Sequence, residues 1–151
     1  MQEQQKNLQK YAKEYYLMGN ECITHMHDTR AALANYDKAI ELYPDYADAW
    51  VRKGVTLFNA DRINEAEACL DQAVRLRPME FKTVYNRGKL RLHTGDTEGA
   101  LADLDKATTL KPQHAGAHEC FGDALTQAGK EMEAAIQYRL AEELRKRKNN
   151  S

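Results

Sequence analysis

Several residue types that often organise small proteins are scarce in this chain of 151 residues, which has three cysteines, three prolines and one tryptophan. Cys22, Cys69 and Cys120 are odd in number and far apart, and they form no C-x-x-C pair, so neither a disulfide framework nor a zinc site is indicated. Their simplest role is that of small apolar packing residues in a reducing compartment. We therefore expect a cytoplasmic protein without a metal ion or other cofactor.

An excess of one charge is also missing, because 22 lysines and arginines accompany 23 aspartates and glutamates. A protein that binds nucleic acid through its phosphates needs a basic surface, and this composition offers none. No apolar run approaches the roughly 20 residues of a membrane-spanning helix. The polar start, MQEQQKNLQK, lacks the apolar segment of a secretory signal. We expect neither nucleic-acid binding nor membrane insertion.

Catalytic motifs are absent as well. The sequence contains no glycine-rich phosphate loop, no G-x-S-x-G and no H-E-x-x-H. His25 and His27 with Asp28 could offer metal ligands, but the spacing is weak and no fourth ligand is evident. Cys120 has no evident base partner that would make it a nucleophile. We expect that the chain is not an enzyme.

What the sequence does contain is a repeat. Its prolines, Pro44, Pro78 and Pro112, are evenly spaced, with a period of about 34 residues. Small or bulky residues recur in register with them: Gly19, Gly54, Gly88 and Gly122; Tyr15, Trp50, Val84 and His118; Ala32, Ala66, Ala100 and Ala134; Tyr36, Leu70, Leu104 and Tyr138; Ala39, Ala73, Ala107 and Ala141; Leu42, Leu76, Leu110 and Leu144. A fixed period of this length is typical of a solenoid built from repeated units.

Each copy predicts two helices. Apolar and small residues recur at helical spacing, as from Ala66 to Leu76, in two runs of roughly 12–14 residues. The breaks carry glycine or polar residues, as at 93–96 and 128–130. Each proline ends a copy, because it lacks a backbone donor and clashes with the preceding turn. His118 stands where the second copy has Trp50, so we expect it to pack in the core.

A period of this length with this signature resembles the tetratricopeptide repeat, and the resemblance covers residues 12–146. The resemblance implies an all-α fold, a right-handed α-solenoid (superhelix) of antiparallel helix pairs that acts as a scaffold or adaptor for other proteins. It divides the chain into a polar N-terminal extension, 1–11, which we expect to be helical, four repeats, 12–46, 47–80, 81–114 and 115–148, and a tail, 149–151.

The first copy departs from the pattern. Gly19 stands one position further from Ala32 than Gly54 stands from Ala66, and the third and fourth copies keep the shorter spacing. We therefore predict an insertion of one residue in the turn at 25–28.

In the family that the sequence resembles, the first helix of each pair lines a concave groove that binds peptides. The resemblance places these residues there: Tyr16, Asn20, Val51, Arg52, Val55, Phe58, Lys82, Tyr85, Asn86 and Lys89. Cationic and amide groups above an apolar floor suit a protein or peptide partner with acidic groups. The alternative is that the exposed lysines and arginines only keep the protein soluble.

Some co-chaperones of this family hold the C-terminal carboxylates of chaperones in a two-carboxylate clamp. Of the five clamp positions, this sequence keeps Asn20 and Lys82. Tyr16 replaces the first lysine. At the two other positions the residue types are exchanged, because Arg52 stands where the clamp has asparagine and Asn86 stands where it has arginine. The clamp is only partly matched, so we do not expect that partner.

Met132, Ile136 and Leu140 form an apolar stripe at helical spacing near the end of the chain. The corresponding positions of the other copies are polar or small: Arg30, Ala34 and Lys38; Asn64, Ala68 and Gln72; Glu98, Ala102 and Lys106. In the family, a further helix usually covers the last pair. We expect the stripe to form a homo-oligomer interface in the last repeat. Two alternatives are that a longer protein covers it, with this chain as its targeting module, or that Glu142 helps this end to cap itself.

Overall fold

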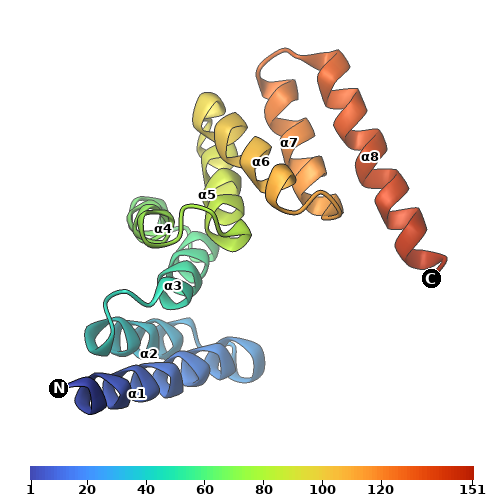
Figure 1. Cartoon of the computed structure of the whole chain (residues 1–151). Helices are drawn as coiled ribbons and strands as arrows, with labels where there is room; N and C mark the ends of the chain where they lie inside the picture. Colours follow the sequence, from blue (N-terminus) through green and yellow to red (C-terminus); the bar gives the residue numbers. More distant parts are fainter. The chain divides into compact units, whose positions relative to one another are not determined.

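The computed structural model describes residues 1–151 and contains helices and turns but no strand. The helices are α1 (Gln2–Glu21), α2 (Thr29–Leu42), α3 (Ala47–Asn59), α4 (Ile63–Leu76), α5 (Phe81–Thr94), α6 (Thr97–Leu110), α7 (Ala115–Gln127) and α8 (Glu131–Asn149) (Figure 1). A short π-helix, Cys22–Met26, directly follows α1. The predicted all-α class is confirmed. None of these helices combines the length and the apolar character needed to cross a bilayer.

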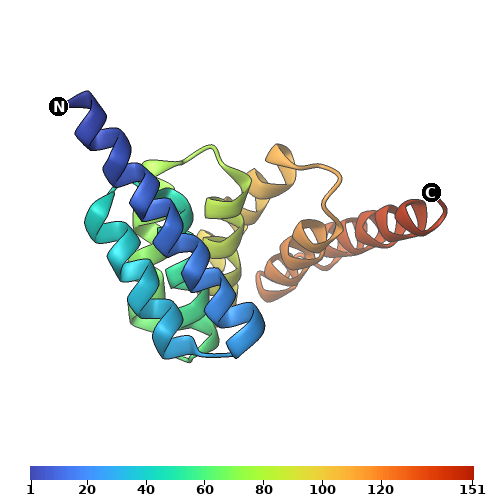
Figure 2. The ribbon, with the colours of Figure 1, turned by 90° about the horizontal axis from the view of Figure 1, so that it is seen from below.

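The helices form two compact units, Met1–Arg77 and Pro78–Ser151. In the first unit, α1 packs against α2, α3 packs against α4, and α2 also contacts α3. In the second unit, α5 packs against α6, α7 packs against α8, and α6 also contacts α7. The members of each pair run side by side in opposite directions, as Figures 1 and 2 show. Each unit is therefore two stacked antiparallel helix pairs.

Close helix contact within each pair depends on a glycine of its first helix. A side-chain carbon at Gly122 would lie 2.6 Å from Cε1 of Tyr138, and one at Gly54 would lie 2.8 Å from Cγ of Leu70. Gly19 faces Tyr36 and Gly88 faces Leu104 in the same way. The recurring large residue of the second helix therefore packs directly on the backbone of the first helix, which explains why both positions recur in the sequence.

The extra residue of the first copy lies in the π-helix. One residue more separates Gly19 from Tyr36 than separates Gly54 from Leu70. A π-helical turn holds one residue more than an α-helical turn, so the pair can keep its glycine contact. His27 ends this turn in the left-handed conformation, with φ of 52°. Asp28 then caps α2 by accepting a hydrogen bond of 2.9 Å from the amide of Ala31.

His118 packs in the core, as predicted, with 8% of its surface exposed. Its Nε2 donates to the carbonyl oxygen of Pro112 at 2.8 Å. In the second copy, Nε1 of Trp50 donates to the carbonyl oxygen of Pro44 at 2.7 Å. The two rings therefore attach the first helix of their pair to the proline that ends the preceding copy.

A buried charge cluster between α5 and α6 was not predicted from the sequence. Asp103 is 4% exposed, and its carboxylate faces two arginines. It accepts two hydrogen bonds of 2.8 Å from Arg87 and one of 3.0 Å from Arg91. Such charge-assisted, bidentate bonds offset much of the cost of removing these charges from water.

Candidate peptide-binding surfaces

The residues predicted to bind peptide in the first unit lie on α1 and α3. Tyr16 is half-buried, with its ring centre 6.3 Å from that of Tyr36 and 5.2 Å from that of Tyr46. The side-chain oxygen of Asn20 accepts a hydrogen bond of 2.9 Å from the hydroxyl of Tyr36. Both predicted residues are therefore tied to the tyrosine that packs on Gly19.

A cavity of about 270 Å³ opens beside these tyrosines. It is lined by Ile23, His27, Thr29, Tyr36, Arg52, Val55, Thr56, Asn59 and Ala60. We call it the Arg52 cavity. Two of the residues predicted from the sequence, Arg52 and Val55, share its wall. Ile23 and His27 reach it from the π-helix and from the residue that follows, so the extra residue of the first copy shapes this site.

Arg52 supplies the positive charge of the cavity. Its side chain is exposed and forms no ion pair within the chain. Burial raises the pKa of the Tyr36 hydroxyl, and the positive charge of Arg52 partly opposes that rise. The guanidinium and the phenol therefore act on the same space, which Thr29 and Thr56 also line.

The two other apolar residues predicted on α3 lie outside the lining of this cavity. Val51 is buried, with 5% of its surface exposed, so it belongs to the core. Phe58 is half-buried. The apolar part of the cavity comes instead from Ile23 and Val55.

In the second unit, Tyr85 is the centre of an aromatic cluster. Its ring stacks on Phe81 with 4.9 Å between ring centres and meets the edge of His114 at 5.2 Å. The ammonium group of Lys89 lies 4.6 Å from the ring centre of Tyr85. The hydroxyl of Tyr85 lies 3.8 Å from the sulfur of Cys120, and burial, followed by Cys120, raises the pKa of this tyrosine.

The two remaining predicted residues of α5 are engaged locally. The side-chain amide of Asn86 donates to the carbonyl oxygen of Lys82 at 2.8 Å. The ammonium group of Lys82 lies 3.8 Å from a carboxylate oxygen of Glu80. In this unit the structure brings together Tyr85 and Lys89, and it adds Phe81 and His114, which were not predicted to lie in the site.

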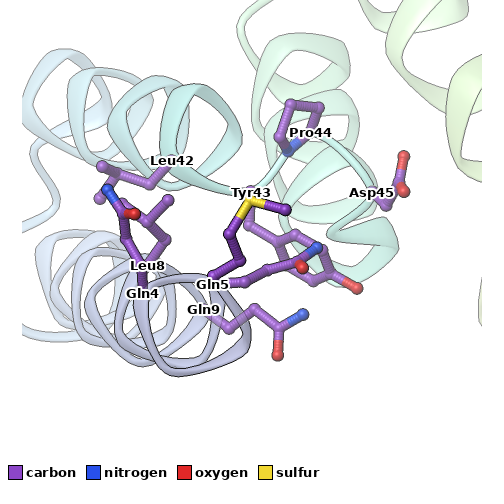
Figure 3. A pocket seen from close by; sticks show the side chains of 9 residues that line it. Gln4, Gln5, Leu8, Gln9, Leu42, Tyr43, Pro44 and Asp45 are labelled. Carbon is purple, nitrogen blue, oxygen red and sulfur yellow. The ribbon is translucent and has the colours of Figure 1, made fainter.

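A second cavity of the first unit, of about 420 Å³, contains none of the predicted peptide-binding residues. Figure 3 shows it between the first turns of α1 and the end of α2. Its lining is Met1, Gln4, Gln5, Leu8, Gln9, Leu42, Tyr43, Pro44 and Asp45. Unlike the Arg52 cavity, this cavity has no cationic side chain.

The apolar stripe of the last repeat is exposed. Met132, Ile136 and Leu140 are 85%, 60% and 38% exposed. Their counterparts on α2, α4 and α6 are exposed or half-buried too: Arg30, Ala34, Lys38, Asn64, Ala68, Gln72, Glu98, Ala102 and Lys106. The stripe therefore lies on a face that is exposed to solvent on the second helix of each pair. The lack of a covering helix does not explain why this face is apolar on α8.

Potential metal ligands do not gather anywhere in the chain, since no group of three or more histidine, cysteine, aspartate or glutamate side chains is placed to hold an ion. His25 and His27 are both exposed.

The chain is similar to known repeat proteins. Two family models, each described as tetratricopeptide repeat, match residues 25–85 and 56–115. A crystal structure of MamA superposes with a TM-score of 0.83, at 21% identity, and the match covers 93% of this chain and 81% of that one. This likeness shows the fold.

Two curated relatives differ greatly in length. An uncharacterised protein of Methanocaldococcus jannaschii is 41% identical over 77 residues, which are 51% of this chain and 88% of that protein. BBSome complex member BBS4 of Xenopus tropicalis is 27% identical over 95 residues, which are 63% of this chain but 18% of that protein.

A third relative, Superkiller complex protein 3 of Homo sapiens, is 32% identical over 94 residues, which are 61% of this chain and 6% of that protein. The chain therefore spans less than a fifth of these two larger relatives. The repeat, the stacked helix pairs and the two matching models lead to one assignment. The chain is a member of the tetratricopeptide-repeat family, whose repeats form scaffolds for protein–protein interaction.

Proposed function

We propose that this scaffold is an adaptor that binds an acidic peptide segment of a partner protein, with the Arg52 cavity as the site for a carboxylate. The observation that carries the proposal is Arg52 itself, an exposed guanidinium without an ion pair beside a cavity. A guanidinium can donate two parallel hydrogen bonds to one carboxylate. Thr29 and Asn59 line the same cavity, and their hydroxyl and amide groups would complete the contact.

The size of the cavity limits what it can hold. At about 270 Å³ it falls just below the range of roughly 300–1,000 Å³ that is usual for complete small-molecule sites. It suits one side chain or chain terminus of a longer peptide. Ile23 and Val55 would contact the methylene groups of that residue, and Arg52 its carboxylate.

The aromatic cluster of the second unit supports the same class of ligand. Lys89 above Tyr85 offers a positive charge beside an aromatic surface. A peptide that carries acidic and apolar residues would satisfy both groups. In addition, two relatives are named as members of protein complexes, which is consistent with a role in assembly.

Selection from a random-sequence peptide library displayed on phage, with the whole chain as bait, tests this function. We expect the selected peptides to be rich in aspartate and glutamate and to bind less tightly as ionic strength rises. Arg52→Gln should weaken the best peptide by about 10- to 150-fold, which corresponds to the roughly 1.5–3 kcal/mol of a charged hydrogen bond.

Arg75→Gln is the matched control, because Arg75 is an exposed arginine of the same unit outside the Arg52 cavity. The affinity of the Arg75→Gln variant for the selected peptides should equal that of the unmodified chain. Selected peptides without carboxylates, or equal affinities for Arg52→Gln and the unmodified chain, would contradict the proposed function.

A further inference from the structure

The solvent-exposed face of α8 that carries the apolar stripe differs chemically from the same face of α2, α4 and α6, the second helices of the other pairs. On α2, α4 and α6 this face carries charged, amide or alanine side chains, whereas on α8 it carries Met132, Ile136 and Leu140. Met132 and Ile136 fill little space inside the unit, since 85% and 60% of their surfaces are exposed, and Leu140 leaves 38% of its surface exposed beside them. Isoleucine is also a weaker helix former than alanine, so local helix stability does not explain Ile136. An aligned, exposed apolar stripe of this kind marks a docking surface.

We propose that the occupant of this surface is the α8 helix of a second copy of the chain, packed antiparallel about a twofold axis near Leu140. The charges along α8 point to this partner. Its first turn holds Glu131 and Glu133, and its last turn holds Lys146, Arg147 and Lys148. An antiparallel partner places acidic turns beside basic ones at both ends of the contact.

The register follows from the sequence positions. Glu133 and Arg147 each lie seven residues from Leu140, which is about 10.5 Å along a helix axis on either side. Across the axis, Glu133 of one copy therefore faces Arg147 of the other, and this pair occurs twice. Neither side chain forms an ion pair within its own chain. Ile136 and Leu144 each lie four residues from Leu140, so they also face each other across the axis.

A parallel arrangement would lose these contacts. It would place Glu133 of one chain beside Glu133 of the other, and Arg147 beside Arg147. Like charges at such distances repel. It would also align the two helix dipoles, whereas the antiparallel arrangement opposes them. A twofold contact is closed, so it produces a dimer and not a filament.

The dimer is expected to be weak. The stripe consists of three apolar side chains, far less than the roughly 800 Å² per partner of a standard stable interface. Association should therefore depend strongly on concentration.

Sedimentation equilibrium of the whole chain at concentrations up to about 1 mM measures the association. We expect the average mass to rise with concentration toward twice the monomer mass. Ile136→Glu should return it to the monomer mass, because the substitution places a charge in the centre of the stripe. Ala102→Glu, at the counterpart of Ile136 on α6, should associate like the unmodified chain.

Charge exchange tests the register and the identity of the partner. Glu133→Arg and Arg147→Glu should each weaken association, by about tenfold or more, because each sets like charges opposite one another. The double variant restores opposite charges and should associate like the unmodified chain. Restoration is possible only if both residues meet across one interface between two copies.

A chain that stays monomeric over this range would overturn the proposal and would leave the stripe to an unrelated protein. Association that survives Ile136→Glu would also overturn it. If the double charge variant associates no better than the single variants, the antiparallel register is wrong. Far-ultraviolet circular dichroism of each variant confirms that the helices are intact.

Discussion

The side-chain amide group of Gln137 lies 2.7 Å from Nδ1 of His118, so both ring nitrogens of this histidine are hydrogen-bonded inside the second unit. In the second repeat, the same two positions hold Cys69 and Trp50. Trp50 has one ring nitrogen, which it uses to bind the carbonyl oxygen of Pro44. The fourth repeat therefore has the pair His118 and Gln137 at the two positions where the second repeat has Trp50 and Cys69.

Removing the His118 hydrogen bonds should destabilise the protein. His118→Phe leaves both Gln137 and the carbonyl oxygen of Pro112 without this partner, so we expect a loss of about 1–3 kcal/mol in the free energy of unfolding. Urea denaturation followed by circular dichroism measures it. The double variant His118→Trp/Gln137→Cys transplants the pair of the second repeat and should lose less than His118→Phe. A double variant less stable than the phenylalanine variant would show that the two sites are not equivalent.

Asp103 should be essential for the stability of the second unit. Asp103→Ala removes the carboxylate that binds Arg87 and Arg91, and it leaves two largely buried guanidinium groups without it. Breaking a buried pair in this way costs about 3–5 kcal/mol. Thermal and urea denaturation should both show the loss.

Asp105→Ala is the control for this loss, because Asp105 is an exposed carboxylate on the same helix. It should change the free energy of unfolding by less than about 0.5 kcal/mol. Similar stabilities for the two alanine variants would mean that the Asp103 cluster contributes little.

The positions that recur in every copy were sufficient to predict the fold, because packing alone selects them. Gly54 and Leu70 recur since they touch, and both lie buried. Asp103 was not predicted, because it occupies a position held by Cys69 in the second repeat and its partners come from another helix. The sequence shows one carboxylate among many, and only the fold shows which one is buried.

His114 should make stability depend on pH. Its Nδ1 accepts a hydrogen bond of 3.0 Å from the amide of Ala117 and so caps α7. Burial, followed by the nearby charges of Lys111 and Lys89, lowers the pKa of His114 in the folded chain below 6.5. Over the range between the two pKa values, the unfolded chain binds more protons than the folded chain. The free energy of unfolding therefore falls as the pH decreases through about 6.5 toward the folded pKa.

His114→Asn is the variant that isolates this effect, because asparagine caps a helix without titrating. Urea denaturation at about pH 7.5 and about pH 5.5 should show a larger loss for the unmodified chain than for His114→Asn. Equal losses in the two proteins would show that this cap is not linked to protonation.

Deleting His25 should remove the extra residue of the π-helix. His25 is exposed, and the other three repeats form their helix pairs with one residue less at this turn. We expect the helical content to be retained, whereas affinity for acidic peptides should fall because Ile23 and His27 no longer line the Arg52 cavity. Circular dichroism and peptide titration measure the two effects. Unchanged affinity in a folded deletion variant would show that the π-helix does not shape the site.

The candidate site was only partly predictable, for a physical reason. The family pattern identifies which residues face away from the second helix, and so it selected Arg52 and Tyr85. It does not show that Val51 is covered by neighbouring side chains or that His114 joins the aromatic cluster, because both depend on contacts between different helices. The extra residue near His27 was visible as a change of spacing, but not its form as a π-helix.

The π-helix has a consequence for how such proteins diversify. One additional residue widens a single turn, and the glycine contact between Gly19 and Tyr36 on either side of it is made as in the other pairs. A single extra residue can therefore remodel the edge of one cavity in a repeat array and leave the glycine contact of its helix pair intact. Neighbouring paralogues could acquire different ligands through insertions of this size alone.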